Sequence, residues 1–356
     1  MTSPASAPRK LGCLLVTGGA GFIGSAFIRY LFRQPSFTGK IINYDLLTYA
    51  GNLDNVAGAV DEGRYRFVHG DICDRDRLLK TCDDEGVDTI VHFAAESHVD
   101  RSILGPGAFV QTNVVGTFQV LEVIRARPSL HLHHVSTDEV FGSLGATGLF
   151  TEDSPYQPNS PYSASKAGSD HLVRAYAHTY GISTTHSNCS NNYGPFQFPE
   201  KLVPLMVLNM LEGKPLPVYG DGMNVRDWLY VDDHAEAIWL VLQSGKTGES
   251  YNVGGRAEWA NLPLLHRLIE IVAEQSGREV AALKNLITFV KDRPGHDRRY
   301  AVDSSKIETE LGFRQAHNLD TGLAETVRWY IDNRAWVERV RSGAYREWIE
   351  KNYATR

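Results

Sequence analysis

The sequence predicts an α/β protein with a doubly wound parallel sheet and a smaller C-terminal part of α+β character. Short apolar runs alternate with longer amphipathic stretches between residue 13 and about residue 188. Within the short runs, apolar residues do not alternate with polar ones, which is typical of strands buried on both faces. After residue 188 this rhythm is lost, and a segment rich in Asn, Gly, Pro and aromatic residues follows. The fold class rests on these observations.

Buried strands are expected in the first part at CLLVT (13–17), KIINYD (40–45), YRFVHGD (65–71), TIVHFAA (89–95), LHHVST (132–137) and STTHSN (183–188). Helical spacing of apolar residues predicts helices between them, at 22–34, 74–86, 108–126 and 163–181. Because strand, helix and strand repeat in this order, the strands should pair in parallel with helices on both faces of the sheet.

The second part begins with a predicted loop, SNNYGPFQFPEKLVP, that leads into a helix at 202–211. Further helices are expected at 233–243 and 261–276, and short strands at 216–220, 250–255 and 287–290. A final amphipathic region at about 320–340 closes the chain. We therefore divide the chain into a mobile tail (1–10), a first domain (11–190) and a second domain (191–356), with some exchange of chain between the two domains.

Composition excludes several classes of protein. At about 150 residues per domain, 356 residues predict two domains. A net charge of −6 disfavours coating of nucleic acid and binding to an acidic membrane. The cysteines (Cys13, Cys73, Cys82 and Cys189) show no metal-binding spacing and are expected to be reduced. The first ten residues contain no apolar stretch, so no secretory signal is predicted, and we expect a cytoplasmic protein.

The segment TGGAGFIG (17–24) follows the first predicted strand and precedes the first predicted helix. Gly18 and Gly21 would allow a tight turn and a close approach to a pyrophosphate, and Gly24 would let helix and strand pack closely. The helix N-terminus would present its amides to the phosphates. Asp45 ends the second strand, where a carboxylate binds a ribose 2′-hydroxyl. The sequence therefore predicts a Rossmann-type domain that binds NAD rather than NADP.

Tyr162 and Lys166 lie one helical turn apart in PYSASK, so both side chains project from the same helix face. A nearby ammonium, together with a nicotinamide cation, would favour the phenolate and make Tyr162 a base near neutral pH. Thr137, Asp138 and Glu139 follow the fifth strand, at the edge of the sheet where doubly wound folds bind ligands. Adjacent acids at this place can act as proton donor and acceptor if their pKa values differ.

A group of histidines, His131, His133 and His134, lies at the start of the fifth predicted strand. No acidic residue nearby in the sequence has metal-ligand spacing, so we interpret these histidines as structural and expect no metal.

Longer motifs extend over nearly the whole chain. They are LVTGGAGFIGS, YDLLTYAGNL, VHGDI, HFAAESHVDRS, HVSTDEVFG, PNSPYSASKAGSD, NCSNNYGPFQFPEKL, VYGDGMNVRDWLYVDDH, YNVGG, DRPGHDRRYAVD and WVERVRSGAYREWIEKNY. With these motifs the chain resembles the extended short-chain dehydrogenase/reductase family, and within it the dTDP-glucose 4,6-dehydratases. The acid pair in STDEV is more specific than the glycine-rich turn, because related sugar epimerases lack it. Phe141 departs conservatively from the tyrosine that is usual in the family.

The resemblance implies conversion of dTDP-glucose to dTDP-4-keto-6-deoxy-glucose and water with tightly bound NAD. Tyr162, assisted by Thr137 and Lys166, would take the proton of the 4-hydroxyl while hydride leaves C4. Glu139 would take the C5 proton, and Asp138 would protonate the departing 6-hydroxyl. Hydride would then return to C6.

The resemblance also implies two sets of binding residues. The expected NAD contacts are Gly18, Gly21, Phe22, Ile23, Gly24, Asp45, Leu46, Leu47, Thr48, Asp71, Ile72, Phe93, Ala94, Ala95, Thr112, Tyr162, Lys166 and Asn192. The expected substrate contacts are Ser97, Thr137, Asn191, Lys201, Leu202, Pro217, Val218, Tyr219, Arg226, Asn261, Asp292, Arg293, Pro294, Gly295 and His296. Among these, Lys201, Arg226 and Arg293 carry the positive charge that a nucleotide diphosphate needs.

Alternative functions remain at this point. A dehydratase for UDP- or CMP-sugars would use the same groups. A nucleotide-sugar 4-epimerase would need Tyr162 and NAD but not Asp138 and Glu139. A silent NAD-binding regulator belongs to a different class, and the retained catalytic residues argue against it. The family further implies a homodimer, formed through the helices around 108–126 and 161–180.

Overall fold

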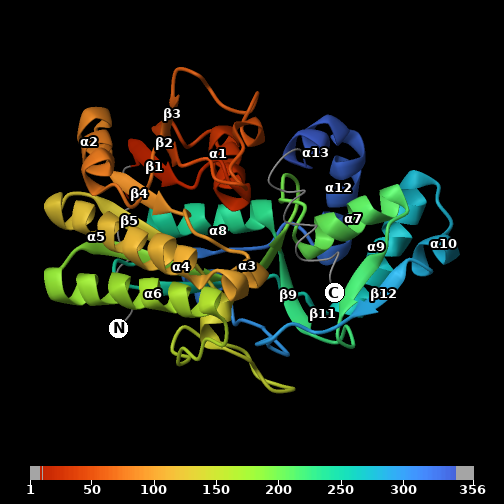
Figure 1. Cartoon of the computed structure of the whole chain (residues 1–356). Helices are drawn as coiled ribbons and strands as arrows, with labels where there is room; N and C mark the ends of the chain where they lie inside the picture. The colour runs from red at the N-terminus through yellow and green to blue at the C-terminus, as the bar shows by residue number, and fades with distance from the viewer. Residues whose placement is uncertain (1–8, 10, 342–356) are drawn as a thin grey trace.

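A computed structural model describes Arg9 and residues 11–341, and its largest element is a seven-stranded sheet (Figure 1). The strands are β1 (Cys13–Thr17), β2 (Lys40–Asp45), β3 (Tyr65–His69), β4 (Thr89–His92), β5 (His131–Thr137), β6 (Ser183–Cys189) and β10 (Ser250–Val253). Their order is β10-β6-β5-β4-β1-β2-β3, and every neighbouring pair is parallel. β2 and β3 are added to one side of β1, whereas β4, β5 and β6 are added to its other side. The strand order therefore reverses between β1 and β4, and doubly wound sheets bind ligands at such a point.

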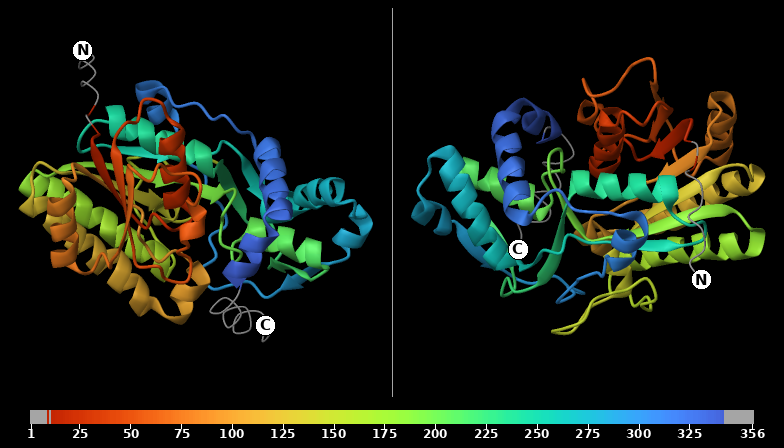
Figure 2. Two further views of the ribbon diagram at one scale, coloured as in Figure 1. Left: turned by 90° about the horizontal axis from the view of Figure 1, so that it is seen from above. Right: turned by 180° about the vertical axis from the view of Figure 1, so that it is seen from behind.

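Helices cover both faces of this sheet (Figure 2). One face is covered by α1 (Phe22–Arg33) and α8 (Val231–Ser244), and the other by α2 (Arg75–Glu85), α5 (Thr117–Ala126) and α6 (Pro161–Tyr180). Alternate residues of β1 separate accordingly, because Leu14 packs in the cluster with α1 and α8, whereas Leu15 packs in the cluster with α2 and α5. The prediction of a doubly wound parallel sheet is confirmed.

The segment between β4 and β5 is helical in several pieces. They are α3 (Val99–Leu104), α4 (Pro106–Phe109), the π-helical η2 (Val110–Gly116) and then α5. A Cβ atom at Gly116 would lie 2.5 Å from Ile72, so glycine lets this wider turn approach the loop after β3. The expected single helix at 108–126 is therefore helical throughout but changes its winding.

The C-terminal part has its own core and two small sheets. The three-stranded sheet has the order β11-β9-β7, and β12 pairs with β8. The strands are β7 (Asn191–Tyr193), β8 (Leu216–Tyr219), β9 (Val225–Tyr230), β11 (Glu258–Ala260) and β12 (Ile287–Val290). The helices are α7 (Leu202–Glu212), α9 (Asn261–Ser276), α10 (Val280–Lys284), α12 (Leu319–Asp332) and α13 (Arg334–Arg341). Apolar side chains of α7, α9, α12 and α13 enclose the core of this part.

The chain passes between the two parts more than once. α8 packs on α1, and β10 forms one edge of the large sheet beside β6. α11 (Ser305–Leu311) packs against both α8 and β10. Segments beyond residue 190 thus complete the body that contains the glycine-rich turn.

Several expectations about single elements were wrong. The strands expected at 65–71 and 89–95 end at His69 and His92, and β3 is only partly buried because it is the other edge strand. The sequence reasoning missed β7, β9 and β11, which are short or belong to a small sheet. The amphipathic region at 320–340 forms two helices, α12 and α13, which are separated at Asn333.

Most of the expected N-terminal tail lies outside the described residues. Within it, Arg9 donates hydrogen bonds to the carbonyls of Val241 (3.2 Å) and Leu242 (3.0 Å) near the end of α8. Among the helices that the structure describes, none is both long and apolar enough to span a bilayer.

Candidate active site

The glycine-rich turn between β1 and α1 is shaped for close contact between backbones. Gly18 has φ +71°, and a Cβ atom there would lie 2.7 Å from the amide nitrogen of Ala94. A Cβ atom at Gly24 would lie 2.4 Å from the carbonyl oxygen of Gly18. The N-cap residue of α1, Gly21, offers no capping side chain, and the first turn of α1 contains no acidic residue. A helix end of this kind fits an anionic pyrophosphate.

Asp45 stands at the end of β2, beside this turn. One carboxylate oxygen accepts from the amide of Ala20 (2.9 Å) and the other from the amide of Leu47 (2.7 Å). Burial raises the pKa of Asp45, and these amide hydrogen bonds oppose the increase. Each oxygen keeps a further lone pair, so Asp45 can still accept a ribose hydroxyl. Leu47 has φ +53°, a left-handed backbone conformation that is uncommon for any residue other than glycine.

Most of the other expected NAD contacts follow strand ends of the large sheet, and the rest lie in α1, η2, α6 and β7. Phe93 and Ala94 leave β4 with their amides bound to Thr17, at 3.1 Å to its carbonyl and 3.2 Å to its hydroxyl. Asn192, which lies in β7, accepts from the ring of His234 (2.9 Å). The remaining positions are Leu46 and Thr48 after β2, Asp71 and Ile72 after β3, Ala95 after β4, Thr112 in η2, and Phe22 and Ile23 at the start of α1. These residues fit a dinucleotide at the sheet edge.

Thr137 ends β5, and the 3₁₀ helix η3 (Asp138–Phe141) follows directly. The Thr137 hydroxyl caps η3 by accepting from the amide of Glu139 (3.3 Å), and Asn188 on β6 donates to the Thr137 carbonyl (3.1 Å). Asp138 is 1% exposed, and among the described residues its Oδ2 atom has no hydrogen-bond partner. Burial, Glu139 and Asp227 raise the pKa of Asp138 well above its usual range. A raised pKa favours the protonated form of Asp138, which is the form that a proton donor needs.

Glu139 has a different environment from its neighbour. Burial raises the pKa of Glu139, but Arg293, Arg226 and Lys201 act in the opposite direction. Those three cations come from three separate segments of the C-terminal part. Because Asp138 has fewer cations beside it, the two adjacent acids differ in the way that a donor and an acceptor require.

Tyr162 and Lys166 lie in the first turns of α6, which begins at Pro161. Ser160 forms a capping box with Ser163, with a bond of 3.1 Å from the Ser163 amide to the Ser160 hydroxyl. This cap fixes the start of α6 at the residue before Tyr162. Lys166 Nζ donates to the carbonyl of Val135 on β5 (2.9 Å).

The expectation that Lys166 and a nicotinamide cation together favour the phenolate of Tyr162 stays a prediction. Burial and the nearby Glu139, Cys189 and Asp138 raise the pKa of Tyr162 well above its usual range, and a hydrogen bond with Thr137 only partly opposes this. The Lys166 ammonium is held by the Val135 carbonyl, whereas two carboxyl groups lie beside the phenol. A phenolate at Tyr162 would therefore need positive charge from elsewhere, and a bound nicotinamide cation would supply it.

Cations from the C-terminal part face the acid pair. Arg226 on β9 is 5% exposed and donates to the carbonyls of Val225 (2.7 Å) and Asp297 (3.0 Å), with its guanidinium 4.3 Å from the Tyr300 ring centre. Lys201, just before α7, donates to the carbonyl of Ser97 (2.9 Å). Backbone carbonyls hold these cations without neutralising them.

Asp100, on α3, connects Arg293 and Tyr219 to the large sheet. It accepts from the Tyr219 hydroxyl (2.9 Å) and lies 3.5 Å from Arg293 Nη1. Tyr219 is therefore not a core residue. His296 contacts Asp292 (2.6 Å), and Gly295, which follows Pro294, has φ +64°. These contacts order the loop that contains Arg293.

Other expected substrate residues are placed less uniformly. Val218 lies in the core of the C-terminal part, and Leu202 packs against that core, so neither side chain is free to reach a ligand. Pro217 precedes Val218 in β8. Asn191 and Asn261 each have a buried side-chain oxygen without a partner in the part of the chain that the structure describes.

Sequence reasoning missed Asp100, Asp297, Tyr300 and Glu200. Asp297 accepts from Asn159 (2.7 Å) and from the Tyr300 hydroxyl, and so secures the tyrosine against which Arg226 packs. Glu200 accepts from Tyr49 (3.0 Å), and burial raises its pKa to about 7. Asp100, Asp297 and Tyr300 stand in the quoted motifs, but only their contacts in the fold show what they do.

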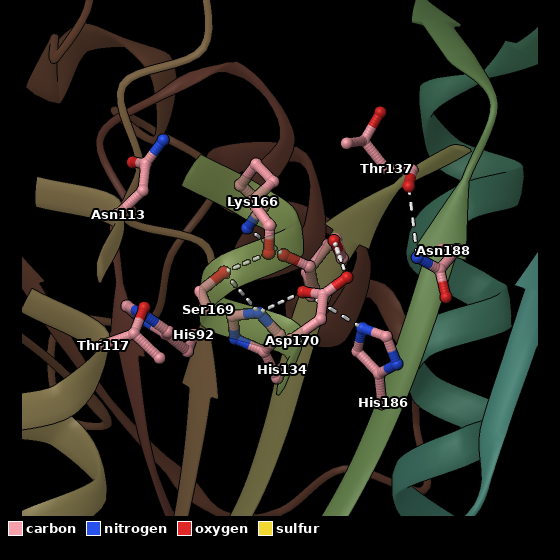
Figure 3. Close-up of polar contacts among 12 residues, drawn as sticks. His92, Asn113, Thr117, His134, Thr137, Lys166, Ser169, Asp170, His186 and Asn188 are labelled. Atoms are coloured by element: carbon pink, nitrogen blue, oxygen red, sulfur yellow. Dashed lines mark hydrogen bonds and ion pairs between the residues drawn. The ribbon is translucent and has the colours of Figure 1, made fainter. Parts of the chain in front are cut away.

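The clustered histidines lie among hydroxyl groups. His131 contacts Ser183 (2.8 Å), and His133 contacts Thr185 (3.0 Å). His134 instead contacts Asp170 (3.0 Å), and His186 lies near the same carboxylate (Figure 3). The potential ligand atoms of His134, Asp170 and His186 all lie within 4.8 Å of one another. Sequence spacing could not reveal this cluster, because it joins three different elements.

Comparisons with known proteins agree with this geometry. Residues 15–326 match the family described as GDP-mannose 4,6 dehydratase. The chain is 53% identical to dTDP-glucose 4,6-dehydratase from Neisseria meningitidis serogroup B over 346 residues, which are 94% of this chain and 97% of that protein.

Solved structures give the same result. dTDP-glucose 4,6-dehydratase from Bacillus anthracis, in complex with NAD, is 47% identical with a TM-score of 0.83. The Streptomyces venezuelae enzyme of the same name, also with NAD bound, is 49% identical with a TM-score of 0.84. Both alignments cover 92% of this chain and 99% of the other. The chain therefore belongs to the nucleotide-sugar 4,6-dehydratase family, and within it to the dTDP-glucose 4,6-dehydratases.

Proposed function

We propose that this protein converts dTDP-glucose to dTDP-4-keto-6-deoxy-glucose and water as an NAD-dependent hydro-lyase. The observation that carries the proposal is the acid pair Asp138 and Glu139, which stands at the end of β5 beside Tyr162. Family membership supports the substrate, since the relatives described above bear its name.

NAD would be held by the glycine-rich turn, Asp45 and the loop after β4, and when bound it supplies an acceptor for hydride from C4 and a donor of hydride to C6. Tyr162 takes the proton of the 4-hydroxyl, and the Thr137 hydroxyl is within reach of Tyr162 to assist. Lys166 contributes positive charge from the next turn of α6. These residues are the ones we assign to oxidation at C4.

Elimination needs an acid and a base that act together. Once C4 is a ketone, the C5 proton is acidic, and the Glu139 carboxylate removes it. The C6–oxygen bond breaks as Asp138 donates its proton to the departing hydroxyl, which leaves as water. The C5 proton is returned after hydride reaches C6. The raised pKa of Asp138 supports its assignment as the acid.

The diphosphate of the substrate is assigned to Lys201, Arg226 and Arg293. All three act on Glu139, so a diphosphate that contacts them holds the sugar beside the acid pair. Arg226 and Arg293 can each donate two hydrogen bonds to a phosphate. Because backbone carbonyls rather than carboxylates hold Arg226, its charge is available for the ligand.

The test is incubation of the purified protein with dTDP-glucose in ²H₂O without added reductant. We expect a product that has lost one water and has gained one deuterium at C5, without net accumulation of NADH. Mass spectrometry and NMR measure both changes.

The control compares Glu139→Gln with Glu274→Gln, which changes an exposed carboxylate on α9. Glu139→Gln should abolish formation of the product, and Glu274→Gln should keep the parental rate. A product of unchanged mass but altered stereochemistry would show a 4-epimerase and contradict the proposal. Turnover of a UDP- or CMP-sugar with dTDP-glucose left unchanged would contradict the proposed specificity for the nucleobase of dTDP-glucose.

A homodimer is supported by large apolar side chains that are exposed on α3, η2, α5 and α6. They are Leu104 (65% exposed), Val110 (52%), Phe118 (38%) and Tyr180 (49%). Apolar side chains gathered on neighbouring helices are typical of an interface. Analytical ultracentrifugation should show a dimer for the parent, and a monomer for Val110→Glu with Phe118→Glu. Phe289→Glu, at an exposed residue of β12, should remain dimeric.

A further inference from the structure

Asp170 lies on α6 one helical turn beyond Lys166 and has no part in the chemistry assigned above. Its side chain is 2% exposed, and its oxygens are occupied by groups from several elements (Figure 3). Ser136 on β5 donates to Oδ2 (2.7 Å), and Tyr156 donates to the same atom (3.1 Å). His134 Nε2 lies 3.0 Å from Oδ1, and His186 Nε2 lies 3.4 Å from it. So many partners indicate a carboxylate with a fixed position.

This carboxylate keeps its negative charge. Burial alone would raise the pKa of Asp170, but His186 and the hydrogen bonds from His134 and His186 hold it well below the usual range. Burial lowers the pKa of His134 to about 4, so His134 is neutral near pH 7. Its Nε2–H can then donate to Asp170. This leaves Nδ1 unprotonated, in agreement with the fact that Nδ1 has no partner in the part of the chain that the structure describes. The imidazole of His134 therefore does not neutralise Asp170.

Lys166 is the buried cation that this charge acts on. Its Nζ donates to the Val135 carbonyl, and among the described residues no carboxylate lies within 4.0 Å of it. Burial lowers the pKa of Lys166, whereas Asp170 and the Cys189 thiol oppose that effect. His92 on β4 and His134 on β5 also face Lys166, but burial holds the pKa of both below the usual range. Asp170 is thus the carboxylate that favours the ammonium form.

The same contacts join α6 to the end of β5. Lys166 binds Val135, and Asp170 binds both His134 and Ser136, so consecutive residues of the strand are fixed from one helix. Thr137, Asp138 and Glu139 follow immediately. A shift of α6 along β5 would therefore move Tyr162 relative to the acid pair.

We infer that Asp170 is a positioning residue that keeps Lys166 charged and holds α6 in register with the end of β5 that carries Thr137, Asp138 and Glu139. The inference rests on the role assigned to Lys166 in the proposed function. Although the cluster with His134 and His186 has the spacing of a metal site, Asp170 already accepts hydrogen bonds from Ser136 and Tyr156. A metal cation would also be repelled by the Lys166 ammonium.

The first test is the pH dependence of kcat for Asp170→Asn, which removes the charge but keeps the size of the side chain. Protonated Lys166 is the active form, so activity is lost as pH rises through its pKa. Without Asp170 that pKa falls, and the alkaline limb should move to lower pH by about one unit or more. Tyr156→Phe is the matched control, because it removes a hydrogen bond to Asp170 but no charge. The alkaline limb of its pH profile should coincide with that of the parent. Coincident limbs for Asp170→Asn and the parent would overturn the inference.

A second measurement does not depend on turnover. NMR titration of the parent labelled with ¹³C at the lysine ε-carbons should show Lys166 protonated at pH 7, and a Lys166→Met variant assigns the signal. Titration of Lys166 below pH 7 would overturn the inference, even if the protein acts on another nucleotide sugar. Stoichiometric metal in the purified protein that is lost in His186→Ala would also overturn it.

Discussion

The two sides of the site hold their titratable groups in different ways. On the side of the large sheet, Asp138, Tyr162 and Lys166 project from regular elements, and buried hydrogen bonds surround them. On the side of the C-terminal part, Lys201 precedes a helix and donates to a backbone carbonyl. Arg293 lies in a loop and contacts Asp100. Rigid elements suit groups that exchange protons at fixed atoms, whereas loop cations can adjust to a flexible diphosphate.

Tyr162→Phe tests the rigid side and should have the largest effect. Because the proton acceptor for the 4-hydroxyl is lost, kcat should fall by about 10³-fold while dTDP-sugar affinity stays within a few-fold. Steady-state kinetics and calorimetry measure the two quantities. Tyr176→Phe, on the same helix but bound to Glu122, is the control and should keep parental kinetics. A loss of affinity equal to the loss of kcat would remove the distinction between the two sides.

Asp138→Asn separates oxidation from elimination on that same side. The amide cannot protonate the departing hydroxyl, so kcat should fall by about 10²-fold. Oxidation at C4 should continue, and reduced nicotinamide should accumulate during the reaction, as followed by its absorbance. Absence of reduced nicotinamide together with a low rate would place Asp138 in the first step instead.

Arg293→Gln tests the adjustable side and should change binding more than chemistry. Loss of a charged hydrogen-bond donor should raise KM by about tenfold, with kcat within a few-fold of the parent. Arg298→Gln is a matched control, because Arg298 is exposed and paired with Asp221 (2.8 Å). A fall in kcat without a change in KM would show that Arg293 belongs functionally with the acid pair.

The smallest effect concerns stability. Since the pKa of Asp138 is raised in the folded state, the unfolded chain loses this proton first as pH rises, and the free energy of unfolding decreases until the folded pKa is passed. Asp138→Asn should therefore raise the free energy of unfolding by about 1 kcal/mol or more at pH 7, and the gain should vanish below the usual Asp pKa. Urea unfolding at both pH values measures it. Asp221→Asn, at an exposed carboxylate whose pKa Arg298 lowers to about 2, should give no such gain.

What the sequence could predict follows the same division. The glycine turn, the Tyr162–Lys166 spacing and the adjacent acids are local patterns, and the structure places all of them at the carboxyl edge of the sheet. The contacts of Asp100 with Tyr219 and Arg293 join residues far apart in the chain, and no periodicity reveals them. Burial and two carboxyl groups raise the pKa of Tyr162, and their approach depends on the fold rather than on the local Tyr162–Lys166 spacing.

The place of β10 and α8 has a consequence for synthesis of the chain. A ribosome releases β1 to β6 well before these two segments, yet β10 covers one edge of β6, and α8 supplies Ala235 and Trp239 to the core beside α1. Until residue 253 has emerged, the nascent sheet keeps an unpaired strand edge and an uncovered apolar face. Residues 11–190, which contain the glycine-rich turn, therefore do not form an autonomous folding unit. The large sheet can be completed only after the second half of the chain has been translated.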